Sequence, residues 1–386
     1  MNEKKRGKKK AAIAIAIFTL AIMVSVQMAL TAELNETDAA GEDMNYSALA
    51  GDNNKMDVAY LVAQEAAKIA KKELSFSMND PNILAMTDAG YPIGGGKAGG
   101  KTTEQGIDAI TASTGCTIGN GNLLLIQRGK EKPLWFAFFD KETKRCVYLE
   151  VKDSVLEKSS KEFKKLSNAD IFSIIAVEMI GADELLSNPE AWNPKMDAQV
   201  FGGNEFSILT IANVWAKGAP YEFLNAAEFH NHICPGVTSG YFIVKYLDEN
   251  LPLLSSRDSY EIIGCPPWCK DDAIQVIFDK TVGKRYVAMH LTPEDSEQLP
   301  DVAGIYIRWN SAVKRGDGLV LTFNWTKARA VCDIDPAYEN EAWYWWWMRL
   351  KMDMEMTAYL DDPGIFVSTM HAFNVGSTAE IEQLKY

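Results

Sequence analysis

The sequence predicts an α+β fold made of two tandem, related modules, each with an antiparallel or mixed sheet and packed helices. Helix-like and strand-like segments follow one another in both halves of the 386 residues. In addition, the motif from Asp108 to Gly119 recurs from Asp272 to Gly283 at a constant offset of 164 residues. Both copies begin with Asp-Ala-Ile and end with Thr-x-Gly. A repeat with this spacing indicates a duplicated module.

In the first half, apolar residues at helical spacing predict a helix over 56–74. A glycine-rich segment over 90–100 follows. Alternating apolar residues between turn residues predict strands over 122–127 and 134–140. Residues 154–200 are expected to be helical and to connect the two halves.

In the second half, the first long element is expected over 206–215. Pro235 suits the first position of the next helix, where its missing N–H group is not needed, so Cys234 is expected to cap that helix. Residues 240–251 are the expected counterpart of the first helix of the chain, and a further helix is expected over 273–278.

The N-terminus has the pattern of an export signal. Six basic residues within 4–10 precede an almost uninterrupted apolar run over 11–32. The run suits a cleaved signal peptide and is also long enough to span a bilayer, so cleavage and membrane anchorage both remain open. Because the basic end is expected to stay in the cytoplasm, the rest of the chain is expected to be extracytoplasmic, either secreted or anchored to the cell membrane.

Charge argues against nucleic acid as a partner. Acidic residues outnumber basic ones 52 to 39, and without residues 1–32 the net charge changes from −13 to −18. A body this acidic is not expected to bind nucleic acid or anionic lipid.

One short segment concentrates residues that ligate metals. His230, His232 and Cys234 supply two of the four histidines and one of the six cysteines within five positions. Imidazole and thiolate are preferred by borderline-soft transition metals. Two histidines two residues apart share a face if the segment is extended, whereas on a bent segment only one is expected to reach an ion.

Cys269 is the expected further ligand, because it precedes a helix whose N-terminus can face the same pocket as Cys234. Within this set His232, Cys234 and Cys269 are favoured, with His230 as a fourth ligand or as a partner of one. Asp272 lies in the first turn of the helix and is the candidate orienting or proton-accepting carboxylate, hence the candidate catalytic base. A disulfide between Cys265 and Cys269 is the alternative.

Three motifs of the second half, taken in order, resemble the FmdE-like metal-binding domain family of formylmethanofuran dehydrogenases. They are Glu228-Phe-His-Asn-His-Ile-Cys-Pro-Gly236, Cys269-Lys-Asp-Asp-Ala-Ile-Gln275 and Lys280-Thr-Val-Gly-Lys284. The stretch from Gln105 to Leu125 resembles the family less completely. The resemblance implies an α+β core, a metal-binding cleft, frequent dimerisation and an origin in archaea or anaerobic bacteria, in the setting of methanogenesis.

The chain also departs from that family. Asn231 stands where the family has glycine, the first half lacks the histidine and cysteine motif, and a Cys-x-x-Cys zinc finger after the core is absent. Export also departs from a cytoplasmic dehydrogenase component, so that activity is not transferred. The tandem modules are expected to imitate the family's dimer within one chain, with Cys116 and the loop 115–122 closing over the site, and a homodimer is the alternative.

The expected organisation follows from these assignments. Residues 1–32 form a signal peptide or anchor and 33–55 a flexible linker. A degenerate module over 56–170 and a helical connection over 171–205 precede the metal-binding module, which covers 206–386 and ends in an aromatic extension.

Two further patterns bear on cofactors. Residues 95–102 match the phosphate-loop pattern G-x4-G-K-T, but no strand is expected to lead into them, so nucleotide binding is not expected. The block from Trp343 to Met348 is expected to pack in the core or between modules.

The function expected from the sequence is an exported or membrane-anchored protein that binds a transition metal, zinc or iron first. A metalloenzyme acting on a small molecule and a haem or corrinoid carrier are the alternatives. A metal-binding protein should hold its ion tightly and show no turnover. A metalloenzyme should have an open coordination position near a base, and a haem or corrinoid carrier should be coloured.

Overall fold

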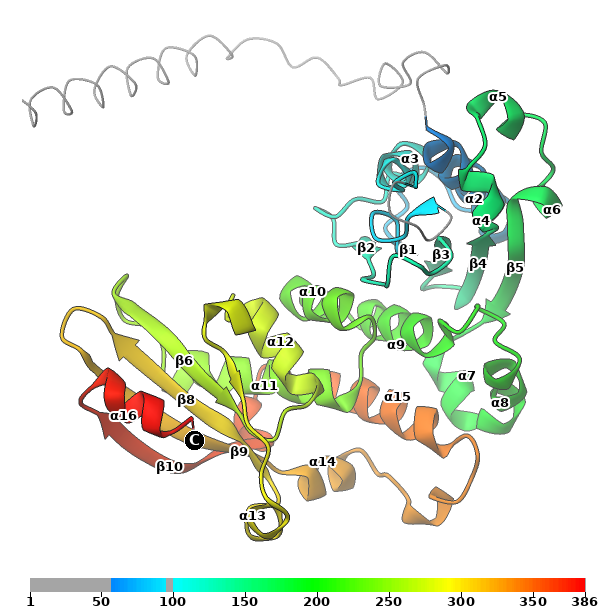
Figure 1. The fold of residues 1–386 in the computed structure, drawn as a ribbon. Coiled ribbons are helices and arrows are strands. Elements are labelled where there is room, and N and C mark those ends of the chain that lie inside the picture. The colour runs from blue at the N-terminus through cyan, green and yellow to red at the C-terminus, as the bar shows by residue number, and fades with distance from the viewer. Residues whose placement is uncertain (1–56, 95–99, 386) are drawn as a thin grey trace, which may run out of the picture. The chain divides into compact units, whose positions relative to one another are not determined.

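The computed structural model describes residues 57–94 and 100–385. Two five-stranded mixed sheets with packed helices make up the described chain (Figure 1), which confirms the predicted α+β class with two tandem modules. The strand order is β2-β1-β3-β4-β5 in the first sheet and β10-β9-β8-β6-β7 in the second.

The first module starts with helix α2 (Val58–Leu74), close to its expected bounds, and helix α3 (Gln105–Thr114) packs against it. Its strands are β1 (Ile83–Thr87), β2 (Leu123–Leu125), β3 (Trp135–Asp140), β4 (Arg145–Val151) and β5 (Phe172–Met179). Between β4 and β5 lie the one-turn helices α4 (Asp153–Leu156), α5 (Ser160–Phe163) and α6 (Asn168–Ile171).

The second module starts with helix α11 (Pro235–Asn250), followed by β6 (Asp258–Gly264) and helix α12 (Cys269–Ile277). Its other strands are β7 (Val287–Ala288), β8 (Val302–Asn310), β9 (Arg315–Phe323) and β10 (Val367–Val375). The remaining helices are α13 (Pro293–Gln298), α14 (Trp325–Val331), α15 (Tyr344–Met356) and α16 (Thr378–Gln383), with 3-10 turns η3 (Val282–Lys284), η4 (Pro336–Tyr338), η5 (Thr357–Tyr359) and η6 (Pro363–Ile365).

The two modules repeat the same topology. In each, a long helix is followed by a strand, a second helix, a short strand that pairs in parallel with the first, and three antiparallel strands. Helix α2 therefore corresponds to α11, and α3 corresponds to α12 at the offset of 164 residues. The counterpart of the first helix begins at Pro235 and not at Gly240 as expected, because Pro235 starts the helix as its first residue.

The connecting segment differs from its expectation. Strand β5 lies inside the stretch 171–205 that was expected to be helical, and it forms the edge of the first sheet. Helices α7 (Ala182–Ser187), α8 (Pro189–Asp197), α9 (Glu205–Ala216) and α10 (Tyr221–His230) then lead to the second module. Phe172 is buried, whereas the other residues of β5 are half-buried or exposed, so its sequence lacks the apolar alternation by which strands are recognised.

One hydrophobic core contains residues of both modules. Leu84 and Leu124 from the first sheet belong to the same buried cluster as Tyr241 of α11 and Phe323 of β9. The aromatic helix α15 supplies Trp346, whose ring is fully buried. Helix α15 contacts α7 and α9, which confirms that the aromatic block is a packing element.

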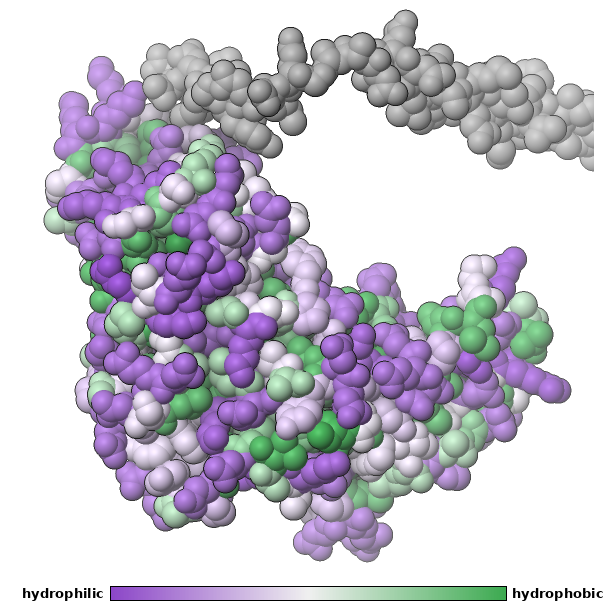
Figure 2. Space-filling model, turned by 180° about the vertical axis from the view of Figure 1, so that it is seen from behind, coloured by the Kyte–Doolittle hydropathy of each residue, from purple (hydrophilic) through white to green (hydrophobic). Residues whose placement is uncertain are grey.

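The segment expected to be a signal peptide or anchor, residues 1–32, lies outside the described residues, as do 33–55 and Gly95–Gly99 of the phosphate-loop pattern. Within residues 57–94 and 100–385, no helix combines the length and apolar character needed to cross a membrane. Residues 91–93 form no strand, as expected. Hydrophilic side chains dominate the face shown in Figure 2, and hydrophobic ones form small separate groups there.

Helices α11 and α12 approach each other closely at Gly240. A Cβ atom added to Gly240 would lie 2.4 Å from the carbonyl oxygen of Lys270 and 2.9 Å from the Cβ atom of Ala273. The backbone of α12 would have to move to make room, because a carbonyl oxygen cannot rotate away as the end of a side chain can.

We expect Gly240→Ala to lower the free energy of unfolding by about 1–3 kcal/mol, since overpacking outweighs the gain in helix propensity. Thermal unfolding followed by circular dichroism measures this as a lower Tm. Gly106→Ala is the matched control, because its added Cβ atom would lie 3.4 Å from that of Ala89, an ordinary contact. An equal Tm for the two variants would show that the helices do not constrain one another.

Candidate metal centre

The histidine and cysteine segment is a sharp turn between two helices. His230 is the last residue of α10, and Cys234 is the N-cap of α11. Between them Asn231 adopts the left-handed conformation with φ 63°. Asparagine tolerates this region better than most residues with a side chain, which explains how it stands where the family has glycine.

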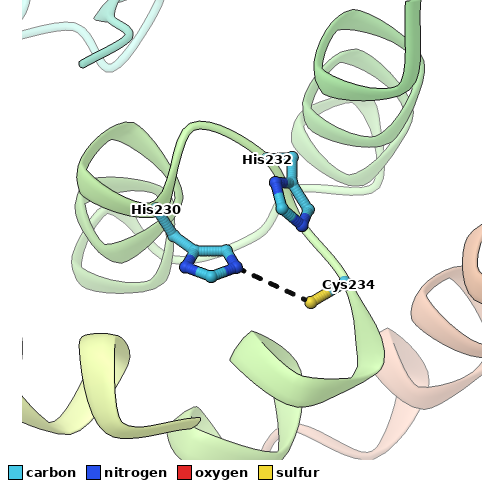
Figure 3. A group of neighbouring side chains, drawn as sticks. All are labelled: His230, His232 and Cys234. Carbon is cyan, nitrogen blue, oxygen red and sulfur yellow. Dashed lines mark hydrogen bonds between the residues drawn. The ribbon is translucent and has the colours of Figure 1, made fainter. Parts of the chain in front are cut away.

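This turn brings three potential ligands together (Figure 3). One nitrogen each of His230 and His232 and the sulfur of Cys234 lie within 4.8 Å of one another. The imidazole rings are 4.4 Å apart between centroids, and Nε2 of His230 lies 4.0 Å from Sγ of Cys234. The expectation that a bent segment presents only one histidine is therefore wrong, because the left-handed residue turns both rings to the same side.

Cys269 adjoins this group from the second helix. It is the first residue of α12, and its side chain lies beside that of Cys234. The approach depends on Gly236, whose added Cβ atom would lie 2.7 Å from Cβ of Cys269 and 3.5 Å from Sγ of Cys234. Cys269 is not one of the three residues whose ligand atoms are all within 4.8 Å of each other. Cys269 therefore lies next to this group of three but is not part of it.

Each histidine is oriented by a hydrogen bond at Nδ1. His230 Nδ1 is 2.6 Å from Oδ2 of Asp272, and His232 Nδ1 is 3.0 Å from Oδ1 of Asn231. With the Nδ1 protons donated to oxygen atoms, the Nε2 atoms are left to bind an ion. Asp272 therefore orients His230, one of the two roles expected of it.

The four groups influence each other's protonation. Burial is the largest single influence on His230 and favours neutral imidazole, but the hydrogen bonds and negative charges of Asp272 and Cys269 together outweigh it and raise the pKa of His230 to about 9. Burial and the nearby charge of His230 lower the pKa of His232 to about 4. The hydrogen bond from Cys234 lowers the pKa of Cys269 to about 5, and the same bond, with burial, raises that of Cys234. One thiolate therefore faces one thiol.

A buried ionic network fixes the N-terminus of α12. Nζ of Lys270 lies 2.8 Å from Oδ1 of Asp271 and donates to the carbonyl of Pro266 at 2.6 Å. Asp271 also accepts hydrogen bonds from the hydroxyl of Tyr286 and the N–H group of Trp268. The side chains of Lys270 and Asp271 are only 5% and 6% exposed, so the pair has no water to compensate for loss of a partner. Neither Lys270 nor Tyr286 was predicted from the sequence.

The first module has a polar pair at the equivalent position. Asp57 is the N-cap of α2, as Cys234 is of α11, and Gln105 begins α3, as Cys269 begins α12. The backbone N–H of Asp57 donates to Oε1 of Gln105 at 3.1 Å. The N-termini of the two helices therefore lie close together in both modules, but only in the second module do cysteines occupy these positions.

The first module contacts helix α10, which ends at His230, close to the site. The carboxylate of Glu228 accepts from the N–H of Leu125 at 2.6 Å, and its carbonyl accepts from the N–H of Gln127 at 2.9 Å. Burial raises the pKa of Glu228 to about 7. Helix α10 is thus attached to the edge of the first sheet two residues before His230.

Cys116 does not close over the site, contrary to expectation. It is buried in the core of the first module, where its sulfur faces the carbonyl of Ile83 at 3.7 Å. The loop 115–122 instead receives a hydrogen bond at the carbonyl of Gly121 from Trp215 of α9. The Cys265–Cys269 disulfide is also not formed, since all six cysteines are free thiols.

The family comparison agrees with the duplication. The family model described as "FmdE, Molybdenum formylmethanofuran dehydrogenase operon" matches residues 59–174 and again residues 229–344. No curated protein matches the chain. The second matched region includes the candidate ligands and Asp272, and the first includes the polar helix end at Gln105. Since the two regions together make up more than half of the sequence, the chain belongs to the FmdE family, with one copy of the family's domain in each module.

Proposed function

We propose that this protein binds one transition metal ion outside the cytoplasm, with zinc or iron as the first candidates. The observation that carries the proposal is the convergence of His230, His232 and Cys234 on one point within a five-residue turn. Ligand atoms of a tetrahedral zinc site lie about 3.4–3.8 Å apart, so the side chains need to move by about 1 Å to enclose an ion.

Cys269 is the fourth ligand in this proposal. It reaches the cluster beside Cys234 and carries the lower thiol pKa of the two. Two imidazoles and two thiolates form a set that suits zinc and also iron, and Asp272 fixes the ring of His230 as carboxylates do behind metal-bound histidines.

A metalloenzyme is the second candidate function, and a cavity of about 530 Å³ that borders His232, Cys234 and Cys269 favours it. In that case one of the four positions stays open for a substrate. Asp272 is engaged with His230, so the structure favours it as an orienting group over a free base.

The metal proposal predicts about one equivalent of bound zinc or iron in the full-length protein purified from its native host without chelators. Elemental analysis measures the ion, and an absorption spectrum of the same sample distinguishes a haem or corrinoid carrier, which would be coloured. Less than about a tenth of an equivalent after reloading with zinc and with ferrous iron would refute the proposal.

Single substitutions test the ligand set. We expect Cys234→Ser, Cys269→Ser and His232→Asn each to weaken zinc binding at least about a hundredfold in competition with a chromogenic chelator, since each removes one of four bonds. Cys116→Ser, in the core of the first module, is the matched control and should keep the affinity of the unaltered protein. If Cys269→Ser also binds zinc as tightly as the unaltered protein, Cys269 is not a ligand and the ion has three protein ligands.

The pKa values predict that metal affinity rises with pH. At pH 7 the thiol of Cys234 and the imidazole of His230, whose pKa is about 9, are protonated, whereas His232 and Cys269, at about 4 and 5, are not. Binding must displace the first two protons, so the apparent affinity for zinc should increase from pH 6 to pH 9. Calorimetry in buffers of different ionisation enthalpy counts the released protons, and a pH-independent affinity would contradict this assignment.

Export is supported by the basic cluster and the apolar run over 11–32. We expect protease added to intact cells or spheroplasts of the native host to digest the protein, while a cytoplasmic marker survives. Mass spectrometry of its N-terminus then separates a cleaved from an anchored form. Full protection of the chain would refute export and leave the metal proposal unaffected.

A further inference from the structure

The cavity beside the candidate metal centre has features of a binding site for an organic molecule. Its volume of about 530 Å³ lies within the range of small-molecule sites. His232, Cys234 and Cys269 form part of its wall, so a molecule in the cavity would touch the ligands of the proposed ion.

Another part of the wall is apolar and aromatic. Trp268 and Trp325 line the cavity with ring centroids 5.5 Å apart, and Met348 and Met352 of α15 add thioether side chains. Trp268 is 56% exposed, which is unusual for the largest apolar side chain and is what a ligand-facing ring requires. These surfaces suit a flat, apolar molecular body.

The same cavity contains two arginines, although the chain as a whole is strongly acidic. Arg329 is exposed and lies 3.9 Å from a carboxylate oxygen of Glu339. Arg349 is half-buried and donates to the carbonyl of Trp345 on its own helix. Within the part of the chain that the structure describes, no carboxylate comes within 4.0 Å of Arg349.

The nearest acidic side chain on that helix does not neutralise Arg349. Asp353 is fully buried and accepts a hydrogen bond from Thr238 at 2.7 Å. Burial raises the pKa of Asp353 well above its usual range and so favours its neutral form, although the hydrogen bond from Thr238 and the charge of Arg349 act in the opposite direction. The guanidinium of Arg349 lines the cavity and has no ion-pair partner among the described residues.

We propose that the cavity binds a small organic carboxylate, whose charged group pairs with Arg349 and whose apolar body lies against Trp325 and Met348. A guanidinium binds a carboxylate through two parallel hydrogen bonds, and an apolar surrounding strengthens that pairing. This inference rests on the proposed function, because it places the carboxylate beside the bound ion as its substrate or as an exchangeable ligand.

The test uses the zinc-loaded full-length protein and two probes of equal shape, para-fluorobenzoate and para-fluorobenzamide, followed by fluorine NMR. We expect the carboxylate to bind at least about tenfold more tightly than the neutral amide. Inorganic phosphate, which has charge but no apolar body, should bind more weakly than the carboxylate.

Variants locate the probe. Arg349→Gln should weaken benzoate binding by about ten- to a hundredfold, and Arg349→Lys should weaken it less, since it keeps the charge but loses the planar fork. Arg257→Gln, on the exposed segment before β6, is the matched control and should bind as the unaltered protein does.

Equal binding of the two probes, or unchanged benzoate binding in Arg349→Gln, would overturn the inference, as would phosphate binding as tight as that of benzoate. Zinc titration of the same samples separates this failure from that of the proposed function. A protein that holds zinc but does not distinguish the probes loses only the carboxylate site, whereas a protein that holds no metal loses the metal proposal itself.

Discussion

Helices α11 and α12 contact each other through Gly236 and Gly240 with no side chain between them, and the candidate metal centre depends on this contact. It sets the distance between the two helix N-termini and therefore between Cys234 and Cys269. The buried pair of Lys270 and Asp271 holds the second of these ends in place. Because both helix ends are fixed by backbone packing and buried charge, the sulfur atoms are positioned before any ion arrives.

The first module shows the same architecture without the chemistry. The N-termini of its helices α2 and α3 also lie close together. There the backbone N–H of Asp57 donates to Oε1 of Gln105, at the positions where the second module has two cysteines. The fold therefore does not require the metal ligands. The modules differ in the segment before the long helix. In the second module, α10 ends at His230, and the left-handed Asn231 that follows it turns the chain so that His230 and His232 lie together.

Much of this could be predicted from the sequence, for identifiable reasons. The duplication was visible because two short motifs recur at the same distance from each other. Asp-Ala-Ile lies on helix α3 in the first module and on α12 in the second, and Thr-x-Gly lies in the segment after each helix. Cys234 was placed at its helix cap because Pro235 is compatible with few other positions. Strand β5 was missed since it is partly exposed. Both histidines were named as metal-site residues, but whether both would reach one ion was left open, because a left-handed asparagine leaves no periodic signal. The position of Cys116 depends on core packing, which sequence spacing does not report.

The attachment of α10 to the first sheet has a consequence for how a duplicated chain evolves. Glu228 is held by the backbone of Leu125 and Gln127, two residues before His230. The first module, which lacks the histidine and cysteine motif, is therefore still structurally linked to the site, because its strand β2 supports the helix that ends at His230. A substitution along β2 would then change the position of a histidine in another part of the chain, so the two copies can differ in sequence and still depend on each other for their geometry.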